Sequence, residues 1–325
     1  MQTRAACCYL AIMAQAPKFD VQEYRDFESL EFYARQVVEG FITGLHKSPF
    51  HGFSVEFAEH RSYNPGESTR NIDWKLYGRT DRLYTKRYEE ETNLRCHLVL
   101  DTSGSMFYPK ERLASIEKPN KILFSSIAIL ALSNLFRKQR DAIGLSLFGN
   151  QDLITEAKST YQHLKMMNTE LFKVLHQYQA PEAPKVSLSQ QLHLMAQKIH
   201  KRSLVLVFTD LFEALENPHE LFDALQHLKH QKHEVVLFWT TDKATELDFD
   251  FEARPYRFVD METGAKIRLN PHELAEAYRQ KTREFEQEMK TRLLQYKIDW
   301  VPVDVAEGYH QILQKYLLKR QRMRG

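Results

Sequence analysis

The sequence predicts an α/β protein with a doubly wound, mostly parallel sheet, and two observations point to this class. Short apolar runs recur along the chain, at 97–100, 142–148, 203–209, 234–240 and 299–305. Segments with the apolar spacing of helices lie between most of these runs. Strands that alternate with helices along a chain typically form a parallel sheet with right-handed crossovers and helices on both faces.

The strongest helix is expected at 118–138, where apolar residues cover most of the helical surface. Such apolarity is typical of a helix that is buried against a sheet. Pro119 near its start agrees with the preference of proline for the first helical turn. Further helices are expected at 160–179, 187–200, 218–231, 271–297 and 308–324, a short strand at 152–157 and a hairpin at 256–269.

The N-terminal part of the chain has a different character. An amphipathic helix, or a pair of helices, is expected at 20–45, whereas 48–91 shows turns and alternating strands such as 53–57. We therefore divide the chain into three parts. Residues 1–19 are a disordered or start-site extension, 20–93 are a helix plus a small β subdomain, and 94–325 are the α/β domain with C-terminal helical additions. A start-site extension would make Met13 the natural first residue.

Composition argues against several classes of function. The chain has 45 Lys and Arg against 43 Asp and Glu, without the basic excess of a dedicated nucleic-acid binder. Its three cysteines, two of them adjacent at Cys7 and Cys8, form neither a disulfide framework nor a zinc pattern, which predicts a reducing cytoplasm. No apolar stretch approaches the roughly 20 residues that span a bilayer, so we expect no membrane span.

The stretch from His97 to Met106 carries the most informative chemistry. Its apolar run ends in the carboxylate of Asp101, and two hydroxyls follow at Ser103 and Ser105. These oxygens suit a hard cation, and Mg²⁺ keeps several waters, so one acid and two hydroxyls suffice as a partial shell. The alternative is an Asp/Ser turn whose hydroxyls cap the next helix.

A second strand favours the metal site over the simple turn. The apolar run at 203–208 also leads to an acid, Asp210, directly after Thr209. In an open parallel sheet, ligands bind beyond the carboxyl ends of the strands, at the point where strand order reverses. Two buried strands that each end in an aspartate therefore predict one shared site for Mg²⁺, with Mn²⁺ or Ca²⁺ as alternatives.

The pattern at 101–105 resembles the metal-ion-dependent adhesion site of von Willebrand factor A domains. Three blocks narrow this resemblance: RSYNPGESTRNIDWKLYGRT at 61–80, KRYEEE at 86–91 and DTSGSM at 101–106. Together they look like the bacterial family called "domain of unknown function 58". Four residues of the first block carry the match and have no assigned role: Arg70, Asp73, Trp74 and Arg79.

The resemblance implies a function as well as a von Willebrand factor A-like fold. Members of that family are typically encoded beside MoxR-type AAA+ ATPases. The implied role is a cytoplasmic adaptor without catalytic activity, which binds such an ATPase through a divalent cation in a chaperone-like or assembly process. An acidic residue of the partner would then complete the metal shell.

One position departs from the adhesion-site pattern. That pattern usually offers a threonine from a third loop, where this chain has Val186, which cannot ligate a cation. Three outcomes are open: the neighbouring Ser187 substitutes, a water fills the gap, or the site is weakened. Capping of the following helix is an equally simple role for Ser187.

Other functions compete with the adaptor hypothesis. No G-x-S-x-G elbow and no phosphate-binding glycine loop is present. A Mg²⁺-dependent hydrolase or phosphatase that uses Asp101 is the main alternative, although haloacid-dehalogenase-like enzymes place a second acid where this chain has Ser103. A structural module with an empty site is a third. Zinc binding by His227, His230 and His233 is disfavoured, because the third histidine lies past the expected helix end.

Overall fold

A computed structural model describes residues 27–46, 60–62, 74–86, 94–109, 115–176, 186–215, 218–261 and 264–324. Its central feature is a six-stranded sheet with the order β10-β7-β6-β3-β4-β5, in which only β5 is antiparallel to its neighbour. The strands are β3 (Arg95–Asp101), β4 (Ala142–Phe148), β5 (Leu153–Ile154), β6 (Leu204–Thr209), β7 (Glu234–Thr241) and β10 (Asp299–Asp304). The predicted α/β class with a mostly parallel, Rossmann-like sheet is confirmed.

The order of the strands reverses beside β3. From β3 the chain crosses to β4 on one side and later returns to β6 on the other side, after which β7 and β10 continue in that direction. The carboxyl ends of β3 and β6 therefore flank the switch point of the sheet, where open α/β sheets bind their ligands.

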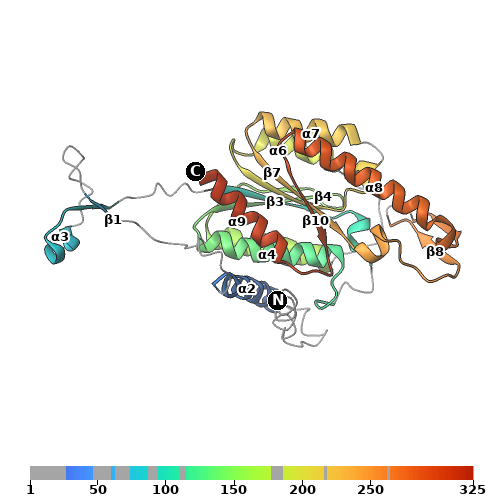
Figure 1. Cartoon of the computed structure of the whole chain (residues 1–325), viewed down its shortest axis with the longest axis horizontal. Coiled ribbons are helices and arrows are strands. Elements are labelled where there is room, and N and C mark those ends of the chain that lie inside the picture. Colours follow the sequence, from blue (N-terminus) through green and yellow to red (C-terminus); the bar gives the residue numbers. More distant parts are fainter. Residues whose placement is uncertain are drawn as a thin grey trace, which may run out of the picture.

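Helices cover both faces of the sheet because side chains alternate along each strand (Figure 1). Leu98 and Leu100 of β3 belong to one apolar cluster, whereas Val99 belongs to the other. The first face carries α2 (Phe27–His46), α4 (Lys121–Lys138), α5 (Tyr161–His176) and α9 (His310–Arg324). The second carries α6 (Leu188–Lys198), α7 (Pro218–His230) and α8 (Pro271–Gln295).

Helix α4 follows the segment 101–105 at the end of β3, which we call the ligand loop. The helix is buried along nearly its whole length, as predicted. It begins at Lys121, because the Asn120 side chain accepts a hydrogen bond from the Leu123 backbone N at 3.0 Å and so caps the helix. Pro119 consequently precedes the cap and lies outside the first helical turn, contrary to the expectation from sequence.

The N-terminal segments add to this core. Helix α2 joins the first apolar cluster through a stripe of four buried residues, Leu30, Ala34, Val38 and Phe41. Strands β1 (His60–Ser62) and β2 (Tyr84–Lys86) pair antiparallel. Between them, 74–80 form the short helix α3 (Trp74–Thr80), where turns and strands were predicted. Local bonds explain the difference: the Thr80 hydroxyl and the Asp81 N donate to carbonyls four residues earlier. The strand expected at 53–57 and the extension at 1–19 lie outside the described residues.

The C-terminal elements agree closely with the prediction. A hairpin forms from β8 (Tyr256–Val259) and β9 (Lys266–Leu269), and β10 pairs parallel with β7. One element was not anticipated: a single π-helical turn, η6 (Lys243–Leu247), directly after β7. Such turns occur frequently at functional sites. No helix in the described part of the chain has both the length and the apolar character needed to cross a membrane.

Candidate metal centre

The loop after β3 holds its aspartate in a fixed orientation. Asp101 is 5% exposed, and its Oδ1 accepts a hydrogen bond from the Ser103 backbone N at 2.9 Å. Its Oδ2 accepts a hydrogen bond from the Thr209 hydroxyl at 2.7 Å, so that the end of β6 also positions it. The short helix η3 (Gly104–Phe107) then turns the chain back toward α4.

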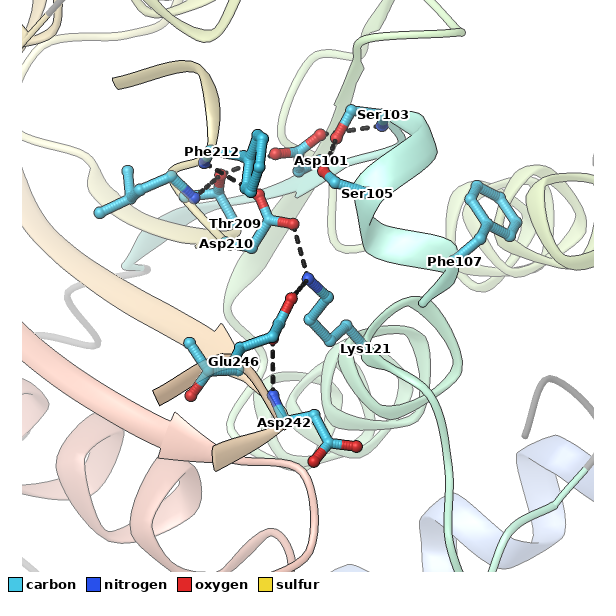
Figure 2. A network of polar contacts seen from close by, with 12 residues as sticks. Asp101, Ser103, Ser105, Phe107, Lys121, Thr209, Asp210, Phe212, Asp242 and Glu246 are labelled. Carbon is cyan, nitrogen blue, oxygen red and sulfur yellow. Dashed lines mark hydrogen bonds and ion pairs between the residues drawn. The ribbon is translucent and has the colours of Figure 1, made fainter. Parts of the chain in front are cut away.

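The two serine hydroxyls of this loop face each other beside Asp101 (Figure 2). The Ser103 Oγ and Ser105 Oγ atoms are 3.1 Å apart. Adjacent ligands of an octahedral Mg²⁺ ion with bonds of about 2.1 Å are about 3.0 Å apart, and for the longer Ca²⁺ bonds the spacing is about 3.4 Å. The two hydroxyls are hydrogen-bonded to each other, and their spacing also equals one edge of a Mg²⁺ or Mn²⁺ octahedron, hard cations that suit oxygen ligands.

Asp210, at the carboxyl end of β6, lies next to this loop and is 8% exposed. Its Oδ1 accepts a hydrogen bond from the Phe212 backbone N at 3.1 Å, and its carbonyl accepts one from the Trp239 indole at 2.9 Å. Leu211, between Asp210 and Phe212 in the sequence, has a φ of 59°, a left-handed conformation that costs free energy for a residue other than glycine. Strain of this kind clusters at functional sites.

The second oxygen of Asp210 binds a lysine that sequence analysis did not anticipate. The Lys121 Nζ lies 2.8 Å from Asp210 Oδ2 and also contacts Glu246 Oε1 of η6. The Lys121 side chain is completely buried. Glu246 in turn accepts a hydrogen bond from the Asp242 backbone N at 2.8 Å, which anchors η6 to the end of β7.

The surroundings of Asp101 disfavour its ionised form. Burial, together with the nearby charge of Asp210, raises the pKa of Asp101 to about 7 although several hydrogen bonds oppose the shift. Within the described residues, Asp101 forms no ion pair with a lysine, arginine or histidine. Burial lowers the pKa of Lys121, but Asp210 and Glu246 outweigh it, and the resulting pKa is above the usual value. Burial also raises the pKa of Glu246. The Asp101 carboxylate is thus buried without a cationic partner from the described part of the chain.

The third predicted loop reaches the same place. The Val186 carbonyl accepts a hydrogen bond from the Gly149 N at 3.1 Å. A Cβ on Gly149 would lie 2.7 Å from the Ser103 N, which places this turn against the ligand loop. Ser187 caps α6, since its hydroxyl accepts a hydrogen bond from the Gln190 N at 3.1 Å within a capping box. The capping role of Ser187 is therefore visible, whereas its role as a ligand stays a prediction.

Some predicted residues fall elsewhere. Arg70 and Asp73 lie outside the described residues, Trp74 begins α3, and Arg79 is exposed near the end of that helix. Thr209, Lys121 and Glu246 were missed as site residues. One signal for Lys121 was present: a cation in the first turn of an apolar helix opposes the helix dipole and needs a nearby acid.

The histidines that the structure describes do not form a second metal centre. His227 contacts His193 of α6, with 3.1 Å between their Nδ1 atoms. In the ranges covered by the structure, no group of three or more His, Cys, Asp or Glu residues is arranged to hold a metal ion. The candidate centre at β3 and β6 instead combines carboxylates with hydroxyls.

The fold and the site define an α/β protein with an acidic, hydroxyl-rich centre at the switch point of its sheet. The chain belongs to the family described as "Protein of unknown function DUF58", whose model matches residues 59–290. Uncharacterized proteins of Mycobacterium bovis and Mycobacterium tuberculosis are 24% identical to it over 184 residues, which are 56% of this chain and 55% of theirs. The chain thus spans about half the length of these curated relatives.

Two solved structures share weak similarity with the chain. An uncharacterized membrane spanning protein from Vibrio fischeri is 13% identical, with 69% of this chain and 96% of that chain covered and a TM-score of 0.21. A mutant of the PilB minor pilin from Streptococcus sanguinis is 8% identical, with 75% and 64% covered and a TM-score of 0.34. Both scores are too low to relate the folds.

Proposed function

We propose that the chain is a non-catalytic module that binds another protein through a divalent cation, in the manner of von Willebrand factor A-like domains. Asp101, Ser103, Ser105 and Asp210 would hold Mg²⁺, directly or through water. One observation carries the proposal: two hydrogen-bonded hydroxyls, spaced as on one edge of a Mg²⁺ octahedron, lie beside a buried aspartate that has no cationic partner among the described residues.

The bound cation would supply an attachment point for a partner. Mg²⁺ coordinated by one or two carboxylates keeps positive charge and exchangeable positions, which attract an acidic residue of another protein. The hydrogen bonds of Asp101 restrain both of its oxygens, which favours a ligand over a mobile nucleophile. The position two residues after Asp101, where haloacid-dehalogenase-like phosphotransfer enzymes place a second acid, is occupied by Ser103.

Exposed apolar side chains next to the centre favour a protein as its partner. Phe212 follows Asp210 in the loop after β6, Leu215 ends the short 3-10 helix η5 (Glu213–Leu215) that comes next, and each is 52% exposed. The Asp210 carboxylate holds the Phe212 backbone, so the ring is displayed at the edge of the centre (Figure 2). A cation flanked by bulky apolar groups suits an acidic residue with an apolar neighbour on the partner surface.

The partner we propose is a MoxR-type AAA+ ATPase in the cytoplasm, in a chaperone-like or assembly role. This part of the proposal rests on the resemblance of the three sequence blocks, together with membership of the family. The von Willebrand factor A-like topology is proposed on the same basis, supported by the aspartates at the switch point.

Affinity capture from the native lysate tests the proposal. The tagged chain is incubated with Mg²⁺ or with EDTA, beside Asp101→Ala and the exposed control Asp223→Ala. We expect an AAA+ ATPase to be enriched only with Mg²⁺, and only by the wild type and the control. Enrichment of the ATPase that is changed neither by EDTA nor by Asp101→Ala would contradict the proposal.

A phosphatase assay separates the main alternative from binding. Turnover of p-nitrophenyl phosphate that needs Mg²⁺ and disappears in Asp101→Ala, but not in Asp223→Ala, would favour a hydrolase. The binding module is expected to show no turnover in any of the three proteins.

A further inference from the structure

The buried side chain of Lys121 connects the candidate centre with η6, the π-helical turn after β7. Lys121 is the first residue of α4, Asp210 directly follows β6 and Glu246 belongs to η6, so three segments far apart in sequence meet at one ammonium group (Figure 2). The exposed fractions of their side chains are 0%, 3% and 23%. A buried charge in this position persists only because its partners compensate for lost hydration.

The charges around the centre do not balance. Asp101, Asp210 and Glu246 supply three carboxylates, whereas Lys121 supplies one ammonium group. With all four groups ionised, two negative charges remain, which is the charge that one divalent cation would neutralise. Lys121 therefore compensates part of the acidic cluster and leaves room for a metal ion beside it.

Asp210 cannot bind Lys121 and a metal ion at the same time without weakening one of the two interactions. Its Oδ1 is held by the Phe212 N, and its Oδ2 is held by the Lys121 Nζ at 2.8 Å. A cation bound to Asp210 would lie close to the Lys121 ammonium group, and the repulsion between the two positive charges would weaken the contact between Lys121 and Asp210. The contact with Lys121 is the one that can yield, because the ammonium group retains Glu246 as its second anchor.

We propose that Lys121 and the divalent cation share Asp210, and that Glu246 sets the balance by holding Lys121 when the metal ion is bound. The proposal rests on the metal centre proposed above and adds to it a resident cation that tunes its affinity. It predicts that metal affinity responds in opposite directions to changes at Lys121 and Glu246.

Calorimetric titration of the EDTA-stripped full chain with MgCl2 tests this inference. In Lys121→Met, Asp210 no longer binds an ammonium group, and the dissociation constant for Mg²⁺ is expected to fall about tenfold. In Glu246→Gln, Lys121 keeps only Asp210 as its partner, and the dissociation constant is expected to rise about threefold. Lys138→Met removes the same charge at the exposed C-terminal end of α4 and should leave binding unchanged.

A charge-balanced double variant makes the test decisive. Lys121→Met combined with Glu246→Gln removes one charge of each sign, so it preserves the net charge of the centre and avoids an unpaired buried glutamate. Sharing of Asp210 predicts that this variant binds Mg²⁺ more tightly than the wild type. A pure effect of net charge predicts no difference. If the double variant does not fold, Glu246→Asp decides: it keeps the charge but shortens the reach to Lys121, so sharing of Asp210 predicts weaker Mg²⁺ binding, whereas a pure effect of net charge predicts no difference.

The outcomes distinguish this inference from the proposed function. Mg²⁺ binding to the wild type with equal or weaker binding to the double variant would overturn the sharing of Asp210 and leave the metal centre intact. Binding to the double variant alone would support sharing and contradict a metal-loaded wild type. Absence of binding in both proteins would contradict both proposals.

Discussion

The loops after β3 and β6 are built alike and differ in one partner. In each loop an aspartate ends a buried strand, and its Oδ1 accepts a hydrogen bond from the backbone N two residues later, Ser103 for Asp101 and Phe212 for Asp210. The other oxygen differs. Asp101 receives the neutral hydroxyl of Thr209, whereas Asp210 receives the ammonium group of Lys121.

This difference explains what each aspartate can do. A buried carboxylate with a lysine partner is electrostatically satisfied and serves the fold, since breaking such a pair is costly. A buried carboxylate with only neutral donors is unfavourable when ionised, and an added cation relieves it. The same local structure therefore yields a carboxylate at β6 that already pairs with Lys121 and a carboxylate at β3 that has only neutral donors among the described residues.

The largest expected effect distinguishes the two aspartates by stability. Asp210→Asn leaves Lys121 with Glu246 alone and should lower the free energy of unfolding by about 3 kcal/mol or more. Asp101→Asn removes a charge without a partner and should leave the stability in EDTA unchanged or raised. Urea denaturation of both variants in EDTA at pH 8 measures this. Equal losses in the two variants would remove the distinction.

Two glycines test how tightly the ligand loop is held. Gly149 and Gly264 both have positive φ, but only at Gly149 would a Cβ meet the chain, 2.7 Å from the Ser103 N. We expect Gly264→Ala to cost about 1 kcal/mol of stability from backbone strain, and Gly149→Ala to cost about 2 to 3 kcal/mol. The measurement is urea denaturation, and a similar cost at both positions would show that contact with the ligand loop is unimportant.

Metal addition should stabilise the fold through Asp101. For a dissociation constant of about 1 mM, 10 mM MgCl2 should raise the free energy of unfolding of the wild type by about 1.4 kcal/mol. Asp101→Asn should show no such increase. Urea denaturation with MgCl2 or EDTA provides the comparison, and an equal increase in both proteins would place the bound cation elsewhere.

His97, in the N-terminal half of β3, gives an effect that is similar in size to that of metal addition and depends on pH. Burial, with smaller contributions from His233 and His163, lowers the pKa of His97 to about 4. The folded state therefore binds fewer protons than the unfolded state, and stability is lost as pH falls below 6.5 toward 4. Between pH 7.5 and 5.5 the loss attributable to His97 should be about 1.4 kcal/mol.

His97→Gln isolates this loss from the other histidines. The variant should lose less stability than the wild type over the same pH interval, as measured by urea denaturation at each pH. Parallel losses in both proteins would mean that His97 titrates normally in the folded chain.

Much of the fold could be predicted because its signals are local. The apolar runs of β3 and β6 end at their aspartates, so both acids were assigned to the sheet edge before any contact was known. Helix ends followed from caps and breakers, as at Ser187. Pro119 misled because the cap at Asn120 begins α4 at Lys121, three residues after the expected start at 118.

The rest of the centre could not be predicted because it depends on tertiary contacts. The bond from Lys121 to Glu246 joins residues 125 positions apart, and a one-turn π-helix sets the position of the acid. Helix α3 was missed because its seven residues show no clear apolar period. Patterns along the chain thus located the aspartates, and only the packed structure shows which of them has a cationic partner.

Binding of Mn²⁺ measured by electron paramagnetic resonance tests the central claim most directly. Mn²⁺ substitutes for Mg²⁺ in oxygen-ligand sites, and its free signal decreases on binding. We predict one site per wild-type chain, competed by Mg²⁺, and none in Asp101→Asn. No binding by the wild type, or equal binding by both proteins, would contradict the assignment of a metal centre to the ligand loop of β3.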